Sequence, residues 1–114
     1  MLENQVHTPP TPAPLLLVKS TVAGTSRISR FADIAAGLKT GSTLNLTRQP
    51  DHFYDNWAIR VSDNQDNFIG YVSCEHNEIL ARLMDGGKHL SAKVTACAPE
   101  GRWHRVHMDV MLHD

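Results

Sequence analysis

The chain has 114 residues, enough for one domain with a modest hydrophobic core. Hydrophobic residues make up 41% and charged residues 20%, which is typical of a soluble globular protein, and no apolar run approaches the roughly 20 residues that cross a bilayer. The net charge of −1 argues against tight, sequence-blind binding to duplex phosphates. The segment from Lys19 to Arg60 nevertheless holds six bases and three acids, so it is either locally positive or simply carries scattered solvated charge.

Residues 1–14 are expected to form a Pro-rich flexible leader, followed by one domain over residues 15–114. Pro9, Pro10, Pro12 and Pro14 disfavour helix and donate no backbone hydrogen bond. The alternative to a simple tail is a docking peptide. The leader has no basic start before an apolar stretch, so we do not expect a secretory signal.

The cysteine content agrees with an intracellular setting. Cys74 and Cys97 are too few for a disulfide scaffold, and we expect two reduced, largely buried thiols. The predicted location is therefore the cytoplasm.

Alternating apolar and polar residues predict six short strands, over residues 15–24, 42–49, 58–62, 68–72, 89–97 and 104–112. Short Asn and Asp side chains predict a turn over residues 63–67, and Pro99-Glu100-Gly101 predicts the last turn. Strands this short and numerous favour a strongly curved sheet or a small closed barrel, since closure hides the sheet edges.

Two segments predict helix. Residues 31–38 are expected to form one or two helical turns after the first strand. The main helix is expected between the fourth and fifth strands, with Ser73 as its N-cap and apolar residues at helical spacing from Glu75 until Gly86-Gly87.

The most informative stretch is residues 47–59, which read Thr-Arg-Gln-Pro-Asp-His-Phe-Tyr-Asp-Asn-Trp-Ala-Ile. It resembles the signature of the HIRAN domain family, in which Arg-x-Pro is followed by a polar pair, Pro-Tyr-Asp and Asn-Ala-Ile. Shorter matches lie at Val22-Ala23-Gly24, Ile69-Gly70-Tyr71-Val72 and residues 79–87, so the likeness covers about residues 20–112 in order. The chain thus resembles a free-standing member of that family. It departs from the signature at Phe53 and Trp57, where the family usually has proline and asparagine.

The resemblance implies a mainly β fold, a small OB-like barrel, and capture of the 3′ end of single-stranded DNA. Carried over by position, Tyr54 stacks on the terminal base and Asp55 accepts a hydrogen bond from the free 3′-hydroxyl. His52 lies at the position of a polar DNA contact, and Tyr71 at that of a phosphate contact.

Two further parts of the implied site match less well. Trp103 lies near the position of another aromatic contact, after a loop that aligns poorly. A helicase-associated member of the family has an Arg-Tyr pair after its first strand, and here those positions hold Ser26 and Arg27. This removes one aromatic surface and shifts the base by one residue.

Elementary chemistry supports these roles and also offers alternatives. Each base stacked on an aromatic ring contributes about 1–3 kcal/mol, and an ionised carboxylate accepts a hydroxyl proton but repels a phosphate. The alternatives are core or rim packing for Tyr71 and Trp103, a ring folded back on the barrel for Tyr54, and a local backbone cap for Asp55. Arg27 and Arg30 either neutralise phosphates or are merely exposed, and Arg48 is expected to brace the loop over residues 51–55.

The sequence gives little support for a catalytic site or a metal site. His104 and His107 would point to opposite faces of a strand, and Cys74-x-His76 has no matching second pair. Asp51 and Asp55 alone make a weak case for a magnesium nuclease. We therefore expect no enzyme, no cofactor and no metal.

The sequence thus predicts a non-catalytic module for single-stranded DNA, acting in repair or stalled-fork processing, with a helicase or nuclease as an associated partner. No membrane and no small-molecule substrate are expected. The rival hypothesis is a protein-interaction adaptor that does not bind DNA.

Overall fold

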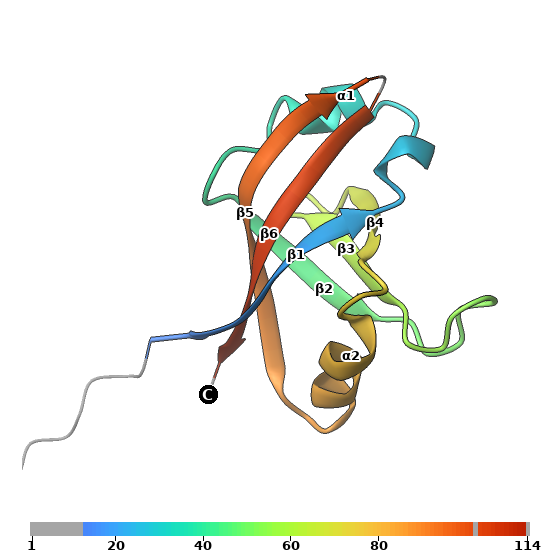
Figure 1. The fold of residues 1–114 in the computed structure, drawn as a ribbon, viewed down its shortest axis with the longest axis vertical. Coiled ribbons are helices and arrows are strands. Elements are labelled where there is room, and N and C mark those ends of the chain that lie inside the picture. The colour runs from blue at the N-terminus through green and yellow to red at the C-terminus, as the bar shows by residue number, and fades with distance from the viewer. Residues whose placement is uncertain (1–12, 102, 114) are drawn as a thin grey trace, which may run out of the picture.

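The computed structural model describes residues 13–101 and 103–113. In chain order these form β1 (Leu15–Ala23), a 3-10 turn η2 (Thr25–Arg27), α1 (Phe31–Ala35), β2 (Thr43–Arg48), β3 (Ile59–Asp63), β4 (Phe68–Val72), α2 (Asn77–Asp85), β5 (His89–Glu100) and β6 (Trp103–His113). The six predicted strands, the main helix between β4 and β5 and the helical turn after β1 are all confirmed (Figure 1).

The six strands form a closed barrel in the order β1-β4-β3-β2-β5-β6, with β6 pairing back onto β1, and every pairing is antiparallel. The long hairpin of β5 and β6 forms one wall and extends beyond the rest of the barrel (Figure 1). Two junctions are short: β1 and β4 share the pairs Val22↔Val72 and Ala23↔Tyr71, and β2 and β5 also share two pairs. The predicted mainly β, OB-like barrel is confirmed.

Alternation along the strands builds the core. In β6, Val106, Met108 and Val110 are fully buried, while the residues between them face outward. Leu44 and Ile59 from β2 and β3 meet them inside the barrel, again with no exposed surface. The alternation of apolar and polar residues in the sequence therefore predicts which side chains fill the barrel.

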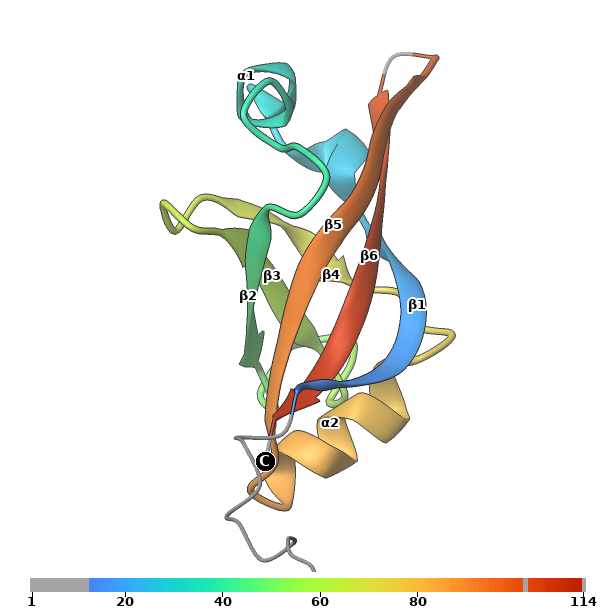
Figure 2. The same ribbon diagram turned by 90° about the vertical axis from the view of Figure 1, so that its left-hand side faces the viewer.

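The helix α2 lies across one end of the barrel, and α1 lies at the other end (Figure 2). Leu80 and Ala81 of α2 are buried against the core. The predicted start of α2 was wrong: the helix begins at Asn77 after His76, and Ser73 is not its N-cap. The carbonyl of Ser73 instead accepts the backbone N–H groups of His76 and Asn77, which makes residues 73–76 a turn before the helix.

The predicted turn at Pro99-Glu100-Gly101 was also wrong in part. Pro99 and Glu100 are the last residues of β5, pairing with His104 and Trp103, so the turn lies beyond Glu100. Proline is compatible with a strand at an edge, where its missing N–H removes no ladder bond. In the described residues β2 pairs with β5 only as far as Lys93, which leaves this end of β5 as an edge.

Both cysteines are free, but only Cys97 is partly buried, and burial raises the pKa of its thiol. Cys74 is exposed, so the expectation of two buried thiols was wrong for Cys74. The predicted leader falls almost entirely outside the described residues. In the part of the chain that the structure describes, no helix is long and apolar enough to cross a membrane.

Candidate nucleic-acid interface

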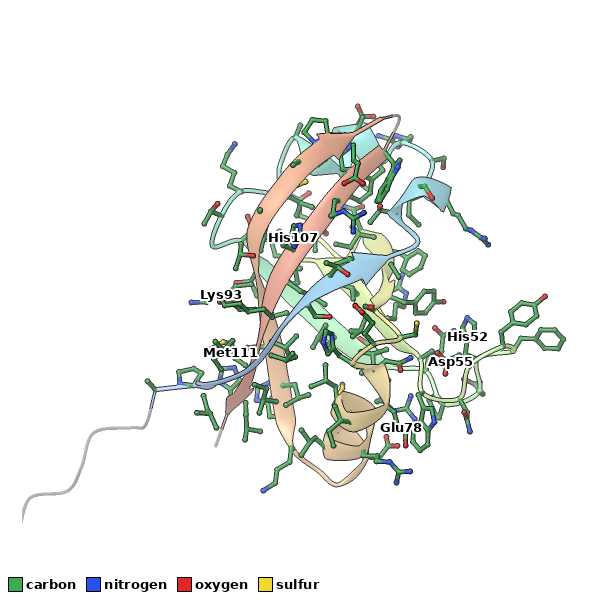
Figure 3. All side chains as sticks on the ribbon, in the orientation of Figure 1. His52, Asp55, Glu78, Lys93, His107 and Met111 are labelled. Carbon is green, nitrogen blue, oxygen red and sulfur yellow. The ribbon has the colours of Figure 1, made fainter. Side chains whose placement is uncertain are left out.

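The loop between β2 and β3 carries the residues that the sequence singled out. Its two ends are joined by a hydrogen bond from the Gln49 N–H to the Ala58 carbonyl, 3.0 Å long. Figure 3 shows His52 and Asp55 on this loop, which projects from the side of the barrel. The loop thus holds its central residues away from the barrel wall while its ends stay fixed.

Arg48, the last residue of β2, anchors the loop to the rest of the molecule. Its guanidinium donates to the carbonyls of Ala58 (2.7 Å) and Asn56 (3.0 Å) and to both carboxylate oxygens of Asp85 at the end of α2 (2.8 and 3.1 Å). The side chain is only 13% exposed. Hydrogen bonding to Arg48 lowers the pKa of Asp85. Arg48 braces the loop as predicted, but at its end rather than at residues 51–55.

Two aromatic rings stand exposed at the tip of the loop. Phe53 is 87% exposed and Tyr54 is 86% exposed, and their ring centroids lie 4.8 Å apart in an edge-on arrangement. The alternative that Tyr54 folds back into the barrel is therefore excluded. Exposed aromatic rings of this size are uncommon without a partner, since burying them is favourable.

An aromatic row continues from the loop tip onto the barrel. His52 lies 6.3 Å from Tyr54 and 5.1 Å from Tyr71 of β4, and Tyr71 lies 5.3 Å from Phe68, measured between ring centroids. The Arg60 guanidinium covers the Phe68 ring at 4.8 Å. We call Tyr54, His52, Tyr71 and Phe68 the aromatic row; Phe53 stands beside it at the loop tip.

Hydrogen bonds hold the middle of this row in place. The Tyr71 hydroxyl donates to the Gln49 side-chain carbonyl (3.1 Å), and the Tyr54 N–H donates to His52 Nδ1 (3.1 Å). Tyr71 and His52 are each half-buried. This part of the row is therefore fixed by hydrogen bonds and remains partly open to solvent.

Asp55 is held from two directions. One carboxylate oxygen accepts the Trp57 N–H (2.8 Å), which is the local cap that the sequence left open as an alternative. The other accepts the side-chain amide of Asn77, a residue only 6% exposed at the start of α2 (2.7 Å). A carboxylate has about four lone-pair positions, so two protein partners leave room for a further donor.

Ser26 and Arg27 lie on η2, at the end of β1, and both are exposed. The Thr25 hydroxyl donates to the carbonyl of His104 (2.8 Å), which ties η2 to β6. Arg27 lines a groove that is also lined by Phe68, the far end of the aromatic row. In the described residues, no carboxylate lies within ion-pair distance of Arg27.

Trp103 lies at the start of β6, half-buried, with the Arg105 guanidinium 5.1 Å from its ring centroid. Among residues 13–101 and 103–113, no ring contact joins Trp103 to the aromatic row. The structure thus brings together His52, Tyr54 and Tyr71 beside Asp55, brings Arg27 to the end of the row, and leaves Trp103 apart.

Phe68 and Arg60 were not selected as site residues from the sequence. Arg60 pairs with Tyr71 across β3 and β4, and a register shift after Val61 brings Phe68 opposite Ser62. Alternation gives Arg60 an outward position, but Phe68 and Tyr71 are three residues apart, so the side they share depends on the register shift and is not visible in the sequence pattern.

Among the described residues, no group of three or more His, Cys, Asp or Glu side chains is placed to hold a metal ion.

A small closed antiparallel barrel with exposed aromatic residues on one side belongs to the class of OB-like barrels, which commonly bind oligonucleotides. The chain belongs to the HIRAN domain family, whose model matches residues 15–113. This family is known generally as a DNA-binding domain, and its domain is a binding rather than a catalytic one.

Two crystal structures are similar. A protein from Lactobacillus plantarum has 27% identity and a TM-score of 0.79, with 90% of this chain and 98% of that chain covered. The HIRAN domain of human HLTF has 21% identity and a TM-score of 0.64, with 85% of this chain and 76% of that chain covered. No curated protein sequence matches the chain.

Proposed function

We propose that this protein binds single-stranded DNA at its 3′ end without cutting it. The observation that carries the proposal is the aromatic row, which begins at the fully exposed Tyr54 ring beside the fixed carboxylate of Asp55. Stacking on rings suits strand binding, because every base has a π-face. The near-neutral charge of the chain is compatible with binding that relies on stacking more than on phosphate contacts.

The roles follow from the chemistry of each side chain. The terminal base stacks on Tyr54, and the 3′-hydroxyl donates to a remaining lone pair of Asp55. His52 offers a polar contact, and the Tyr71 hydroxyl exchanges its hydrogen bond to Gln49 for one to a phosphate beyond the terminal nucleotide. Ser26 and Arg27 contact the backbone further along.

Trp103 is proposed as a last aromatic contact. Because it stands apart from the row in the described residues, DNA would have to bridge the space between them. We infer a cytoplasmic role in repair or stalled-fork processing, with a helicase or nuclease partner that acts on the captured end.

Strands that end in a 3′-hydroxyl or in a 3′-phosphate test the proposal by fluorescence anisotropy. We expect the phosphate to weaken binding by about tenfold or more, which is about 1.4 kcal/mol, because the Asp55 carboxylate repels it. Tyr54→Ala should weaken the binding of both strands by a similar factor, since it removes the ring on which the terminal base stacks. Asp55→Asn should reduce the preference for the hydroxyl, because the amide no longer repels the phosphate.

Phe53→Ala is the matched control, because Phe53 is as exposed as Tyr54 and adjacent to it. If Phe53→Ala and Tyr54→Ala have equal effects, the tip is a general apolar contact and not a stacking site. Equal and negligible affinity for both strand ends would rule out the proposed function.

A protein-interaction adaptor is the second candidate. It is favoured by Leu15 and Leu16 at the start of β1, which are 60% and 44% exposed. An adaptor predicts no binding of either strand, whereas a single-strand binder predicts affinity that falls with added salt.

A further inference from the structure

A groove of about 790 Å³ adjoins the far end of the aromatic row. One wall is formed by the segment from η2 through α1, and the other by the turn between β3 and β4. Figure 2 shows α1 above that turn, on the same side of the barrel. The volume is within the range of about 300–1,000 Å³ that is usual for small-molecule and cofactor sites.

Phe68 connects the groove to the aromatic row. Its ring lies 5.3 Å from Tyr71, and the same residue lines the groove. Successive ring centroids from Tyr54 through His52 and Tyr71 to Phe68 are 5–6 Å apart. A single strand laid along the row would therefore reach the groove within a few nucleotides.

The groove combines an apolar patch with a larger polar lining, a mixture that suits a base. Its apolar lining comes from Ile28, Ile34, Leu38 and Phe68. Its rim carries the exposed side-chain amides of Asn64 and Gln65, each of which both donates and accepts hydrogen bonds. A nucleobase complements this combination, because its flat face is apolar and its edge carries hydrogen-bond donors and acceptors.

The charges that line the groove cancel, which argues against a phosphate cradle. The lining contains Arg27 and Arg30 and, with opposite charge, Asp33 and Asp63. Arg30 donates to the Asp33 carboxylate at 3.4 Å. The Asp63 carboxylate accepts the backbone N–H groups of Gln65 and Asn67 and the side-chain amide of Asn67, which closes the predicted turn.

The backbone of both walls adopts an unusual conformation. Arg30, at the start of α1, has φ 64°, and Asp66, in the turn opposite, has φ 66°. Within the described residues these are the only non-glycine positions with positive φ. Such positions cost about 1–3 kcal/mol and cluster at ligand sites.

We infer that this groove holds a nucleobase of the bound strand, on the 5′ side of the captured terminal nucleotide. The inference rests on the proposed function, since it requires a strand that follows the aromatic row. The occupant is a base of the same strand, because Phe68 belongs to both the row and the groove. The site would therefore recognise a short strand of several nucleotides and not the terminal nucleotide alone.

Ser29→Trp tests this by filling the groove from an exposed lining position outside the aromatic row. Thr40→Trp is the matched control, because Thr40 is exposed and does not line the groove. Affinities are measured by anisotropy for 3′-hydroxyl strands of about two to about eight nucleotides, a span that includes the footprint of a small OB fold.

In the unmodified protein, affinity should rise with length and then level off. Ser29→Trp should lower the affinity of the longer strands by about tenfold, to the level of the dinucleotide, and leave the dinucleotide unchanged. Thr40→Trp should change neither. One abasic position in the longest strand should lower the affinity by the same factor. Ser29→Trp should then cause no further loss of affinity for that abasic strand.

Three results would overturn the inference. Affinity that does not depend on length would place all contacts at the end site, and an abasic strand that binds normally at every position would exclude a base in the groove. A free mononucleotide that binds in a manner sensitive to Ser29→Trp, without dependence on strand length, would make the groove a separate ligand site. Failure of every strand to bind is a different result, because it removes the proposed function as well.

Discussion

At the scale of single residues, Arg48 shows how one side chain couples the loop to the barrel. It joins two loop carbonyls, from Asn56 and Ala58, to the carboxylate of Asp85 at the end of α2. Lysine could not replace it, because only the planar fork of arginine donates in several directions at fixed angles. The position of the exposed rings at the loop tip thus depends on a residue that makes no ring contact itself.

Arg48→Ala should therefore lower the free energy of unfolding by about 1–3 kcal/mol, since charged hydrogen bonds to partly buried carbonyls are lost. Urea denaturation at neutral pH measures this change. Asp85→Asn is the matched control, and it should cost less because the carbonyl bonds of Arg48 remain. A loss for Asp85→Asn as large as that for Arg48→Ala would contradict the assigned role of the carbonyl bonds.

The same pair predicts a pH dependence. Since Arg48 lowers the pKa of Asp85 in the folded protein, the contribution of the pair is present at neutral pH and is lost as the pH falls through that lowered pKa. The stability difference between the unmodified protein and Asp85→Asn should accordingly disappear in acid. A stability difference that grows as the pH falls would contradict a stabilising pair between Arg48 and ionised Asp85.

At the scale of elements, Gly70 is what allows β4 to approach β1. It has φ 145°, and a Cβ added there would lie 2.3 Å from the Ala23 carbonyl oxygen and 2.8 Å from a methyl group of Val22. These two residues make the pairs by which β1 and β4 close the barrel. Close backbone approach therefore requires glycine at this position.

Gly70→Ala should destabilise the fold by about 3 kcal/mol or more, because overpacking and backbone strain act together. Urea denaturation followed by circular dichroism tests this, with Gly37→Ala as the matched control. At Gly37 the added Cβ would make only an ordinary contact, 3.5 Å from the Ile34 carbonyl oxygen. Equal stability of Gly70→Ala and Gly37→Ala would mean that β1 and β4 can separate without cost.

The elements were largely predictable from the sequence because one side of each strand is buried, and a buried side imposes a period of two. The failures came where tertiary contacts decide. Pro99 remains in β5 because this edge of the strand has no neighbouring strand. The helix α2 starts late because β1 holds the turn before it, through a hydrogen bond from the Ser73 N–H to the Thr21 carbonyl and one between the Ser20 hydroxyl and His76 Nδ1. Neither fact is local to the sequence pattern.

At the scale of the whole molecule, the candidate site also has a part that local sequence predicts and a part that only the tertiary structure brings together. The loop residues His52, Tyr54 and Asp55 could be selected because they lie within one continuous motif. Phe68 and Arg60 could not, because their place beside Tyr71 depends on strand register and on a shift in pairing. The groove beyond them is built from segments more than 20 residues apart, and alternation within strands carries no information about it.

The overall charge leads to a final prediction about salt. Two arginines approach the aromatic row, Arg60 over Phe68 and Arg27 at the groove, so we expect about two phosphate contacts in a chain of net charge −1. For single strands, log K should then fall with log salt at a slope of about −1.4, because each contact contributes about −0.7. Anisotropy titrations over a range of salt concentrations measure the slope.

Arg27→Ala should make that slope shallower by about 0.7, since one phosphate contact is lost. Tyr54→Ala should weaken binding at every salt concentration and leave the slope unchanged, because stacking releases no counterions. Lys93→Ala is the control for a general loss of charge, since Figure 3 shows Lys93 on the side of the barrel away from His52 and Asp55. If Lys93→Ala changes the slope as much as Arg27→Ala does, the strand is held by charge spread over the surface and not by the aromatic row.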